Sequence, residues 1–187
     1  MTKENLARNL NQNEEPYNSS SSLPKELEDL VKTKPVTSNI PNLNLRSLED
    51  FNVETVSQMV AAKDLLVVGR AIPSTFAPVL VGAIERLTAG YDNSIVLIVT
   101  PTPKGNVVIY DMVTKLCQGT DIIHADCTNR EAKFHIDTRL FVGTINSLMK
   151  NIQGKKISAA DISLVVAPSL DMISNSREQD QFEALFS

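Results

Sequence analysis

The sequence predicts an α/β fold, namely an open, doubly wound parallel sheet that follows a disordered polar N-terminal tail. From Leu48 onward, short apolar runs of strand length alternate with segments of helical periodicity, which is typical of βα units in a parallel sheet. Hydrophobic residues make up 42% and charged residues 21% of the 187 residues, a composition that fits one globular domain. The longest apolar runs, such as 95–99, are much shorter than the roughly 18 residues of a membrane span, so we expect no membrane contact.

The charge and the cysteines narrow the class of protein. The chain has 18 Lys and Arg against 22 Asp and Glu, a net charge of −4, so binding to a nucleic acid would require a local basic patch. Cys117 and Cys127 are too few for a disulfide framework, and the first residues, Met1 to Asn5, contain no apolar signal segment. These features predict a cytoplasmic or nuclear protein that is not secreted.

The first 45 residues have the composition of a disordered tail. They hold eight Asn, five Ser and four of the nine Pro, and such a segment buries too little apolar area to offset the entropy lost on ordering. We therefore expect residues 1–45 to be a disordered polar tail and residues 46–187 to form the domain. Apolar residues at helical spacing follow a proline within 23–31, which predicts one short helix that is transient or docks on the domain.

Five apolar runs and four segments of helical periodicity predict the elements of the domain in order. The expected strands are 65–68, 95–99, 121–123, 140–142 and 162–166. The expected helices are 75–88, 106–117, 145–152 and 177–186. In the second and third of these helices, apolar residues recur at i, i+3, i+4 and i+7, so each should pack one face on the sheet. Ligands of doubly wound sheets bind at the carboxyl ends of the strands, which makes that edge the expected place of a site.

The loop after the first expected strand has the place and length of a phosphate-binding loop. Such a loop needs glycines whose backbone N–H groups wrap the phosphates, a lysine for the β- and γ-phosphates, and a Ser or Thr hydroxyl for Mg²⁺. The loop consists of Gly69, Arg70, Ala71, Ile72, Pro73, Ser74, Thr75 and Phe76. Isoleucine and serine stand where glycines belong, Thr75 replaces the lysine and Phe76 replaces the hydroxyl. This degenerate loop predicts that the chain binds no nucleotide cofactor.

Four segments, in order, resemble the first RecA-like domain of DEAD-box RNA helicases. The segment from Lys63 to Leu87 resembles the strand, phosphate-binding loop and helix of that domain, without a gap. The stretch 95–104 resembles motif Ia and the stretch 140–149 resembles motif Ib. The stretch 162–173 falls where the family carries its acidic motif. The resemblance covers about residues 60–180 and implies a RecA-like, P-loop NTPase type of fold.

The departures from the family imply an incomplete helicase domain, within residues 46–187, that has lost its chemistry. Ala167, Pro168, Ser169 and Leu170 stand at the four positions of the acidic motif. Without the two carboxylates, this motif has no ligand for Mg²⁺ and no group to orient an attacking water. We therefore expect ATP and Mg²⁺ as cofactors only if the chain is a divergent active helicase. The sequence also stops short of the family's Ser-Ala-Thr strand and second RecA-like domain, so we expect no unwinding cleft.

The same resemblance implies a contact with RNA. Pro101, Thr102 and Thr144, with Lys104 nearby, lie where the family contacts the phosphate backbone of single-stranded RNA. These four residues are the candidate RNA-binding residues, and few positive charges accompany them. Ordinary turn residues that close βα loops account for the same pattern, so both interpretations stay open.

The residues that bind zinc in other proteins do not form a recognisable pattern here. Cys117, His124, Cys127 and His135 are suitable ligand types, but their spacing matches no familiar structural zinc site. Asp126 and His124 follow a strand, yet no nucleophile stands at a defined spacing from them. We therefore expect no metal site and no catalytic residue.

Three hypotheses for the function follow from these observations. The first is a catalytically inactive helicase-like domain that acts as a protein-interaction or RNA-associated scaffold in RNA metabolism, with a protein partner and weak single-stranded RNA contact. The second is a divergent ATP-dependent RNA helicase, or a fragment of one, that binds ATP and RNA. The third is an unrelated small α/β binding protein that shares only the topology. Nucleotide binding separates the first hypothesis from the second.

Overall fold

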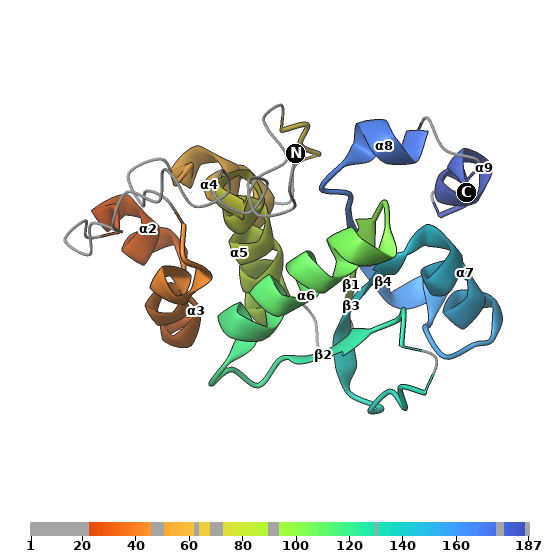
Figure 1. The fold of residues 1–187 in the computed structure, drawn as a ribbon. Helices are drawn as coiled ribbons and strands as arrows, with labels where there is room; N and C mark the ends of the chain where they lie inside the picture. The colour runs from red at the N-terminus through yellow and green to blue at the C-terminus, as the bar shows by residue number, and fades with distance from the viewer. Residues whose placement is uncertain are drawn as a thin grey trace, which may run out of the picture.

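A four-stranded parallel sheet with helices on both faces forms the centre of the molecule (Figure 1). The computed structural model of the chain describes residues 23–45, 51–61, 64–67, 73–89, 94–129, 131–174 and 178–185. The strands are β1 (Ile95–Thr100), β2 (Ile123–Asp126), β3 (Thr138–Thr144) and β4 (Ile162–Val166). Their order across the sheet is β2-β3-β1-β4, and every neighbouring pair is parallel. This arrangement confirms the predicted α/β class and the parallel sheet.

The strand β1 lies at the centre of the sheet. All six of its residues are buried, because β3 and β4 pair along its two edges and helices cover its two faces. A parallel strand in this position needs a continuous apolar run, and residues 95–99 form one. The register pairs Thr100 with Thr144, so the carboxyl ends of β1 and β3 lie side by side.

Two apolar clusters, one on each face of the sheet, hold the helices in place. The helices α5 (Pro73–Ala89) and α6 (Pro103–Cys117) share one buried cluster with Val96 of β1. The helix α7 (Ile145–Gln153) shares the other cluster with Leu97. Successive side chains of β1 point to opposite faces, as the two-residue period of a strand requires. The chain therefore winds on both sides of the sheet, in agreement with the doubly wound prediction.

Several predicted elements begin or end elsewhere in the structure. The strand β2 starts two residues later than the predicted 121–123, because the ladder with β3 begins at Ile123. The predicted helix 177–186 contains the shorter α9 (Gln179–Glu183), and α8 (Leu170–Ser174) precedes it without having been predicted. Within the described ranges, no helix is long and apolar enough to cross a membrane.

The predicted tail is wrong for residues 23–45, which belong to the folded core. They form α2 (Lys25–Leu30), α3 (Lys34–Asn39) and the 3₁₀ helix η1 (Ile40–Leu43). Their apolar side chains are few but converge on one buried cluster: Leu27, Val31, Val36, Ile40, Leu43 and Leu45. Composition averaged over the whole segment hid these residues, because the polar ones lie on the outside. The remaining part of the predicted tail, 1–22, lies outside the described residues.

A buried carboxylate and a close helix contact fasten this N-terminal layer. Glu85 of α5 is 2% exposed and accepts hydrogen bonds from the backbone N–H groups of Lys32 (2.8 Å) and Thr33 (3.3 Å). The helix α4 (Val53–Val60) packs against α5 at Gly82, where an added Cβ would lie 2.5 Å from Cβ of Met59. The layer therefore packs on α5 through specific contacts.

The predicted first strand, 65–68, is also wrong in its described part. Leu65, Leu66 and Val67 are not in a strand and are 40%, 74% and 37% exposed, while Val68 lies outside the described residues. A strand exists only where a neighbour accepts its backbone hydrogen bonds. These residues line a groove beside β4 without joining the sheet.

Candidate functional site

The four residues that the resemblance assigns to RNA contact follow two adjacent strands at the carboxyl edge of the sheet. Pro101 and Thr102 come directly after β1, and Thr144 ends β3, where it pairs with Thr100. Lys104 is exposed in the first turn of α6. The fold thus brings the two stretches that resemble motifs Ia and Ib to one place.

The Thr102 hydroxyl is engaged within its own loop. Its Oγ1 accepts a hydrogen bond from the backbone N–H of Gly105 at 3.1 Å, and its carbonyl accepts one from the N–H of Asn106 at 2.9 Å. Thr102 is therefore the N-cap of α6, a position that favours Ser, Thr, Asp and Asn. Capping explains this threonine without RNA, and the exposed Lys104 ammonium is the group best placed to meet an anion.

A buried polar network lies beneath this edge and was missed by the sequence analysis. The side chain of Asn106 is fully buried; its Oδ1 accepts from Thr100 Oγ1 at 3.2 Å. Its Nδ2 donates to Asp126 Oδ1 at 2.8 Å and to Thr128 Oγ1 at 3.2 Å. The network joins β1, α6 and the end of β2. The sequence contains one signal for this network: Asn106 stands three residues before Ile109, so a polar side chain falls on the apolar face of α6.

This network holds together the loops at the ends of β1 and β2. Asp126 Oδ1 also accepts from the backbone N–H and the hydroxyl of Thr128, at 2.8 and 2.6 Å. These side chains satisfy one another by hydrogen bonds, so the network supports the ends of the strands.

A groove of about 1,050 Å³ lies at the end and along the side of β4. One wall consists of β4 and the residues after it, Ala167, Pro168, Ser169 and Leu170. The other lining residues include Thr75 and Phe76 of α5 and residues 64–67. The described parts of the two stretches that resemble degenerate nucleotide-binding motifs thus share one groove. Gly69, Arg70 and Ile72 lie outside the described residues, and Ser74 is half-buried in the first turn of α5.

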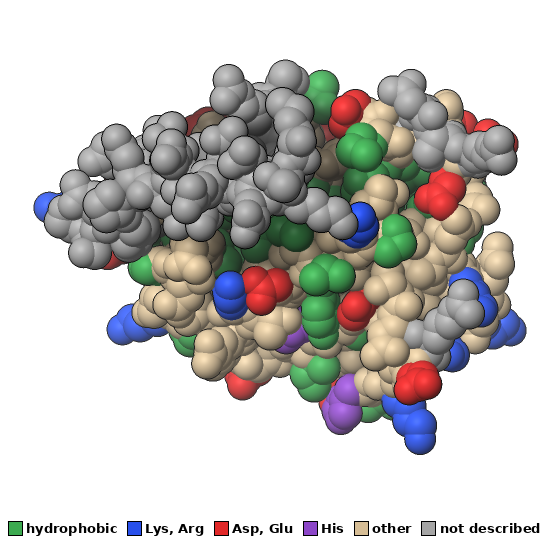
Figure 2. All heavy atoms as spheres, viewed as in Figure 1, with side chains coloured by type: hydrophobic (Ala, Val, Ile, Leu, Met, Phe, Trp, Pro, Cys, Tyr) green, Lys and Arg blue, Asp and Glu red, His purple; other side chains and the backbone are tan. Residues whose placement is uncertain are grey.

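The walls of this groove are mostly apolar. Phe76, which stands where the resemblance would place a Mg²⁺ hydroxyl, packs against the buried cluster on the α5 face of the sheet. The charged residues that line the groove, within the described part of the chain, are Asp64, Arg86 and Asp171. Figure 2 shows apolar side chains reaching the surface over α8 and over α6. The groove is suited to binding apolar groups and has no carboxylate at 167 or 168.

The candidate zinc ligands are not brought together. Cys117 belongs to the cluster beneath α5 and α6, whereas Cys127 belongs to the cluster beneath α7, on the other face of the sheet. Burial raises the pKa of each thiol to about 12, helped for Cys127 by the charge of Asp126. No three His, Cys, Asp or Glu side chains form a metal-binding group in the part of the chain that the structure describes.

The histidine of β2 faces α6 rather than a ligand site. The Nε2 atom of His124 lies 3.2 Å from Thr114 Oγ1, and its ring centroid lies 5.5 Å from that of Tyr110. Burial is the main influence on the histidine and lowers its pKa below the ordinary value of 6.5. His124 is therefore a packing residue that is neutral when the protein is folded near pH 7.

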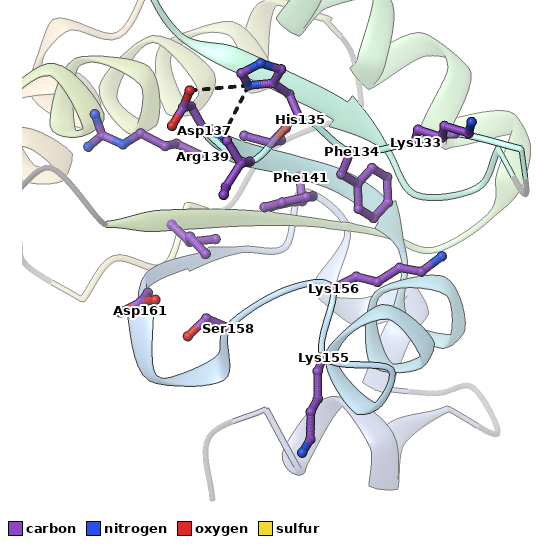
Figure 3. A pocket seen from close by; sticks show the side chains of 14 residues that line it. Lys133, Phe134, His135, Asp137, Arg139, Phe141, Lys155, Lys156, Ser158 and Asp161 are labelled. Carbon is purple, nitrogen blue, oxygen red and sulfur yellow. Dashed lines mark hydrogen bonds and ion pairs between the residues drawn. The ribbon is translucent and has the colours of Figure 1, made fainter.

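A second hollow, of about 590 Å³, lies at the opposite, amino-terminal edge of the sheet (Figure 3). Arg139 lines it and donates to the carbonyls of Leu87 (2.8 Å) and Ser94 (3.2 Å), so this cation ties β3 to the loop before β1. Lys133 and Lys155 also line the hollow, but Figure 3 shows their side chains pointing in different directions. The cations of this hollow do not converge on one anion position.

Neither a protein-family model nor a curated protein matches this sequence. The groove beside β4 is the candidate functional site.

Proposed function

We propose that this chain is a catalytically inactive, helicase-like α/β domain that acts as a protein-interaction scaffold, with weak single-stranded RNA contact as a second property. The observation that carries the proposal is the groove at the end of β4. Ligands of doubly wound sheets bind at such a place, and phosphoryl transfer would need Mg²⁺ ligands there. Ala167, Pro168 and Phe76 offer apolar surface instead.

The RecA-like part of the proposal is supported by where the resembling stretches lie in the sheet. The stretches that begin at 95, 140 and 162 all contain strands, and these are neighbours in the order β3-β1-β4. Because the strands are parallel, the loops that would carry motif Ia, motif Ib and the acidic motif all emerge at one edge. A helicase-like domain requires this common edge.

A protein partner is supported by exposed apolar side chains around the groove. Leu65, Leu66, Val67 and Leu170 line it and are 40%, 74%, 37% and 39% exposed. Met172 follows on α8 and is 51% exposed. Apolar side chains gathered in one place on the surface mark an interaction site more often than scattered ones do.

Nucleotide titration tests the proposal against an active helicase. We expect no saturable heat on titrating ATP or ADP with Mg²⁺ into the chain, because Ala167 and Pro168 supply no carboxylate for Mg²⁺ and Thr75 stands where a phosphate-binding loop carries its lysine. The melting temperature should likewise not rise with nucleotide beyond the change that MgCl₂ alone produces. A rise that saturates below about 1 mM ATP would contradict the proposal, since a ligand at 100 times its Kd stabilises by about 2.7 kcal/mol.

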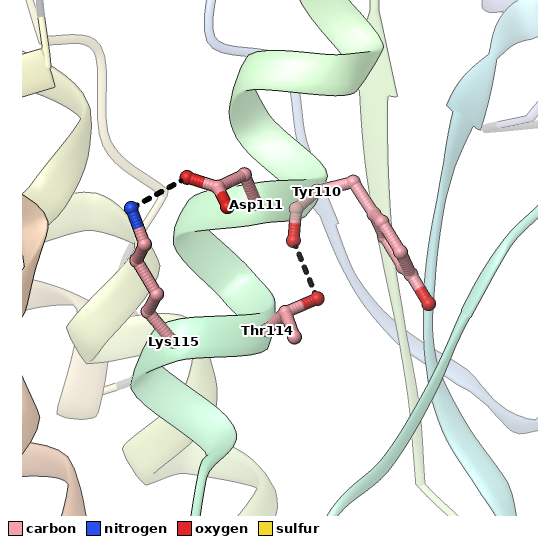
Figure 4. Close-up of polar contacts among 4 residues, drawn as sticks. All are labelled: Tyr110, Asp111, Thr114 and Lys115. Atoms are coloured by element: carbon pink, nitrogen blue, oxygen red, sulfur yellow. Dashed lines mark hydrogen bonds and ion pairs between the residues drawn. The ribbon is translucent and has the colours of Figure 1, made fainter.

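RNA contact is tested with a fluorescein-labelled oligouridine by anisotropy at two salt concentrations. We expect weak, salt-sensitive binding that ATP does not change, and Lys104→Ala should weaken it and reduce the salt slope by about 0.7, the value for one phosphate contact. Lys115→Ala is the matched control, because Lys115 lies on the same helix in an ion pair with Asp111 at 2.8 Å (Figure 4). Equal loss in both variants would place RNA elsewhere, and tight binding that ATP strengthens would favour a helicase.

A further inference from the structure

We propose that the groove beside β4 binds an extended segment of a partner protein, which pairs with β4 as an additional parallel strand of the sheet. This inference rests on the proposed scaffold function and states which surface performs it and which kind of partner fits. The observations that carry it are the unpaired edge of β4, the apolar walls of the groove and the charge of Arg86.

Among the residues that the structure describes, β4 has a neighbour on one edge only. Among the described residues it pairs with β1, and no further strand lies beyond it. Strands inside a parallel sheet are buried on both faces, as all six residues of β1 are. In β4 only Val166 is buried, while the apolar side chains of Ile162, Leu164 and Val165 remain half-exposed. The sequence of β4 is that of an interior strand, but its position is that of an edge.

A second segment, outside the sheet, also lines this groove. It consists of residues 64–67, which are apolar except for Asp64. Phe76 and Val79 of α5 also contribute to its lining. An edge strand presents a row of backbone N–H and C=O groups that another extended backbone satisfies. Side chains at alternate positions of that backbone would then meet the apolar walls, which is how strand addition gains specificity.

The amino-terminal end of β4 is protected against pairing, whereas the rest is not. The register with β1 skips Ser163, whose carbonyl accepts a hydrogen bond from Arg86 Nη2 at 3.5 Å. Irregularities of this kind twist an edge away from an incoming strand. The stretch 164–166 keeps a regular register with β1, so it is the part of β4 to which a partner strand would pair.

Three charged residues line the groove in the described part of the chain, Asp64, Arg86 and Asp171. The cation, Arg86, specifies one further feature of the occupant. Arg86 is half-exposed beside Ser163 and forms no ion pair with any residue in the described ranges. A strand parallel to β4 would place its first residues near this guanidinium. The occupant should therefore begin with an acidic residue and continue with about four residues of high β-propensity, such as Val, Ile and Thr.

A designed peptide tests this recognition directly. The probe is the fluorescein-labelled peptide Asp-Val-Ile-Val-Thr-Val, with one control peptide that carries Lys in place of Asp and one that carries Pro in place of Ile. We expect saturable anisotropy with the first peptide and none with the proline peptide, because proline cannot donate to the ladder. Hydrogen exchange at 164–166 should slow when the first peptide is bound.

Variants of the protein distinguish the contribution of the apolar groove walls to peptide binding from the contribution of the Arg86 charge. Arg86→Glu should weaken the acidic peptide about threefold and favour the lysine peptide by a similar factor, as exposed ion pairs do. Leu66→Lys should weaken both by at least tenfold through the loss of an apolar wall. Val107→Lys is the matched control, because Val107 is 67% exposed on α6 and does not line the groove.

Three results would overturn the inference while leaving the nucleotide result untouched. The first is no binding of the acidic peptide up to 1 mM by chain that circular dichroism shows to be folded. The second is equal binding of the proline peptide. The third is a stable dimer by light scattering, or slow exchange without peptide at those N–H groups of 164–166 that do not donate to β1, which would show that a second copy or the chain itself covers the edge. ATP binding, by contrast, would overturn the scaffold function.

Discussion

The carboxyl ends of β1 and β4 lie at the same edge of one parallel sheet and are built in opposite ways. At the end of β1, the side chains of Thr100, Asn106 and Asp126 are joined by hydrogen bonds, and Thr102 caps the following helix. At the end of β4, Ala167 to Leu170 border an open groove with apolar walls. The end of β1 is therefore packed and hydrogen-bonded, whereas the end of β4 borders an open groove.

This difference teaches where to look for function in a fold of this class. Buried polar groups that satisfy one another stabilise loops and leave little to offer a ligand. By contrast, the free energy falls when a partner covers half-exposed apolar residues on a strand edge. In this chain the polar strand end, which resembles an RNA-contacting motif, is the structural one. The apolar strand end is the stronger candidate for binding.

The largest effect is expected from breaking the polar strand end. Asn106→Ala removes a fully buried amide and leaves Thr100 Oγ1 without its acceptor, so the free energy of unfolding should fall by about 2–3 kcal/mol. Urea unfolding followed by circular dichroism measures the change. Asn129→Ala, at an exposed asparagine, is the control and should stay within about 0.5 kcal/mol. Equal stability of the two variants would mean that the network does not support the fold.

A smaller effect is expected from pH, acting beside the same strand end. Because burial lowers the pKa of His124 in the folded state, the unfolded chain binds a proton that the folded chain does not. This contribution to stability is complete above about pH 6.5, the pKa of an unfolded histidine, and is lost as the pH falls through the lower folded value. Urea unfolding between pH 8 and 5 should show it.

The variant His124→Gln isolates this contribution from the titration of carboxylates. Its stability should fall less steeply than that of the wild type between pH 7 and 5, because the buried ionisable group is gone. The wild type, measured in parallel under the same conditions, is the control. Parallel profiles for His124→Gln and the wild type would show that the histidine does not couple folding to pH.

The smallest effect is expected from charging the apolar strand end. Leu170→Lys places an ammonium on a residue that is already 39% exposed, so the free energy of unfolding should change by less than about 0.5 kcal/mol. The same urea experiment measures it. A loss of more than about 2 kcal/mol would show that Leu170 supports the core, and the contrast between the two strand ends would then disappear.

Local periodicity was sufficient to predict the centre of this fold from the sequence. The run 95–99 and the amphipathic segments 106–117 and 145–152 depend on residues close in sequence, and the structure contains all three. The parallel sheet followed from their alternation. The resemblance also placed Pro101 and Thr144 shortly after the expected strands 95–99 and 140–142, and both lie at the carboxyl ends of strands in the structure.

Only the tertiary structure decided the remaining features, since each depends on residues far apart in the chain. Residues 65–67 have the sequence of a strand but no paired neighbour, and residues 23–45 have the composition of a tail but converge on α5 and α6. The buried side chain of Asn106 needs a hydrogen-bond acceptor, and Asp126, twenty residues away in the sequence, provides it. A strand needs a partner, a short helix needs a surface and a buried amide needs an acceptor, and none of these can be read from a local pattern.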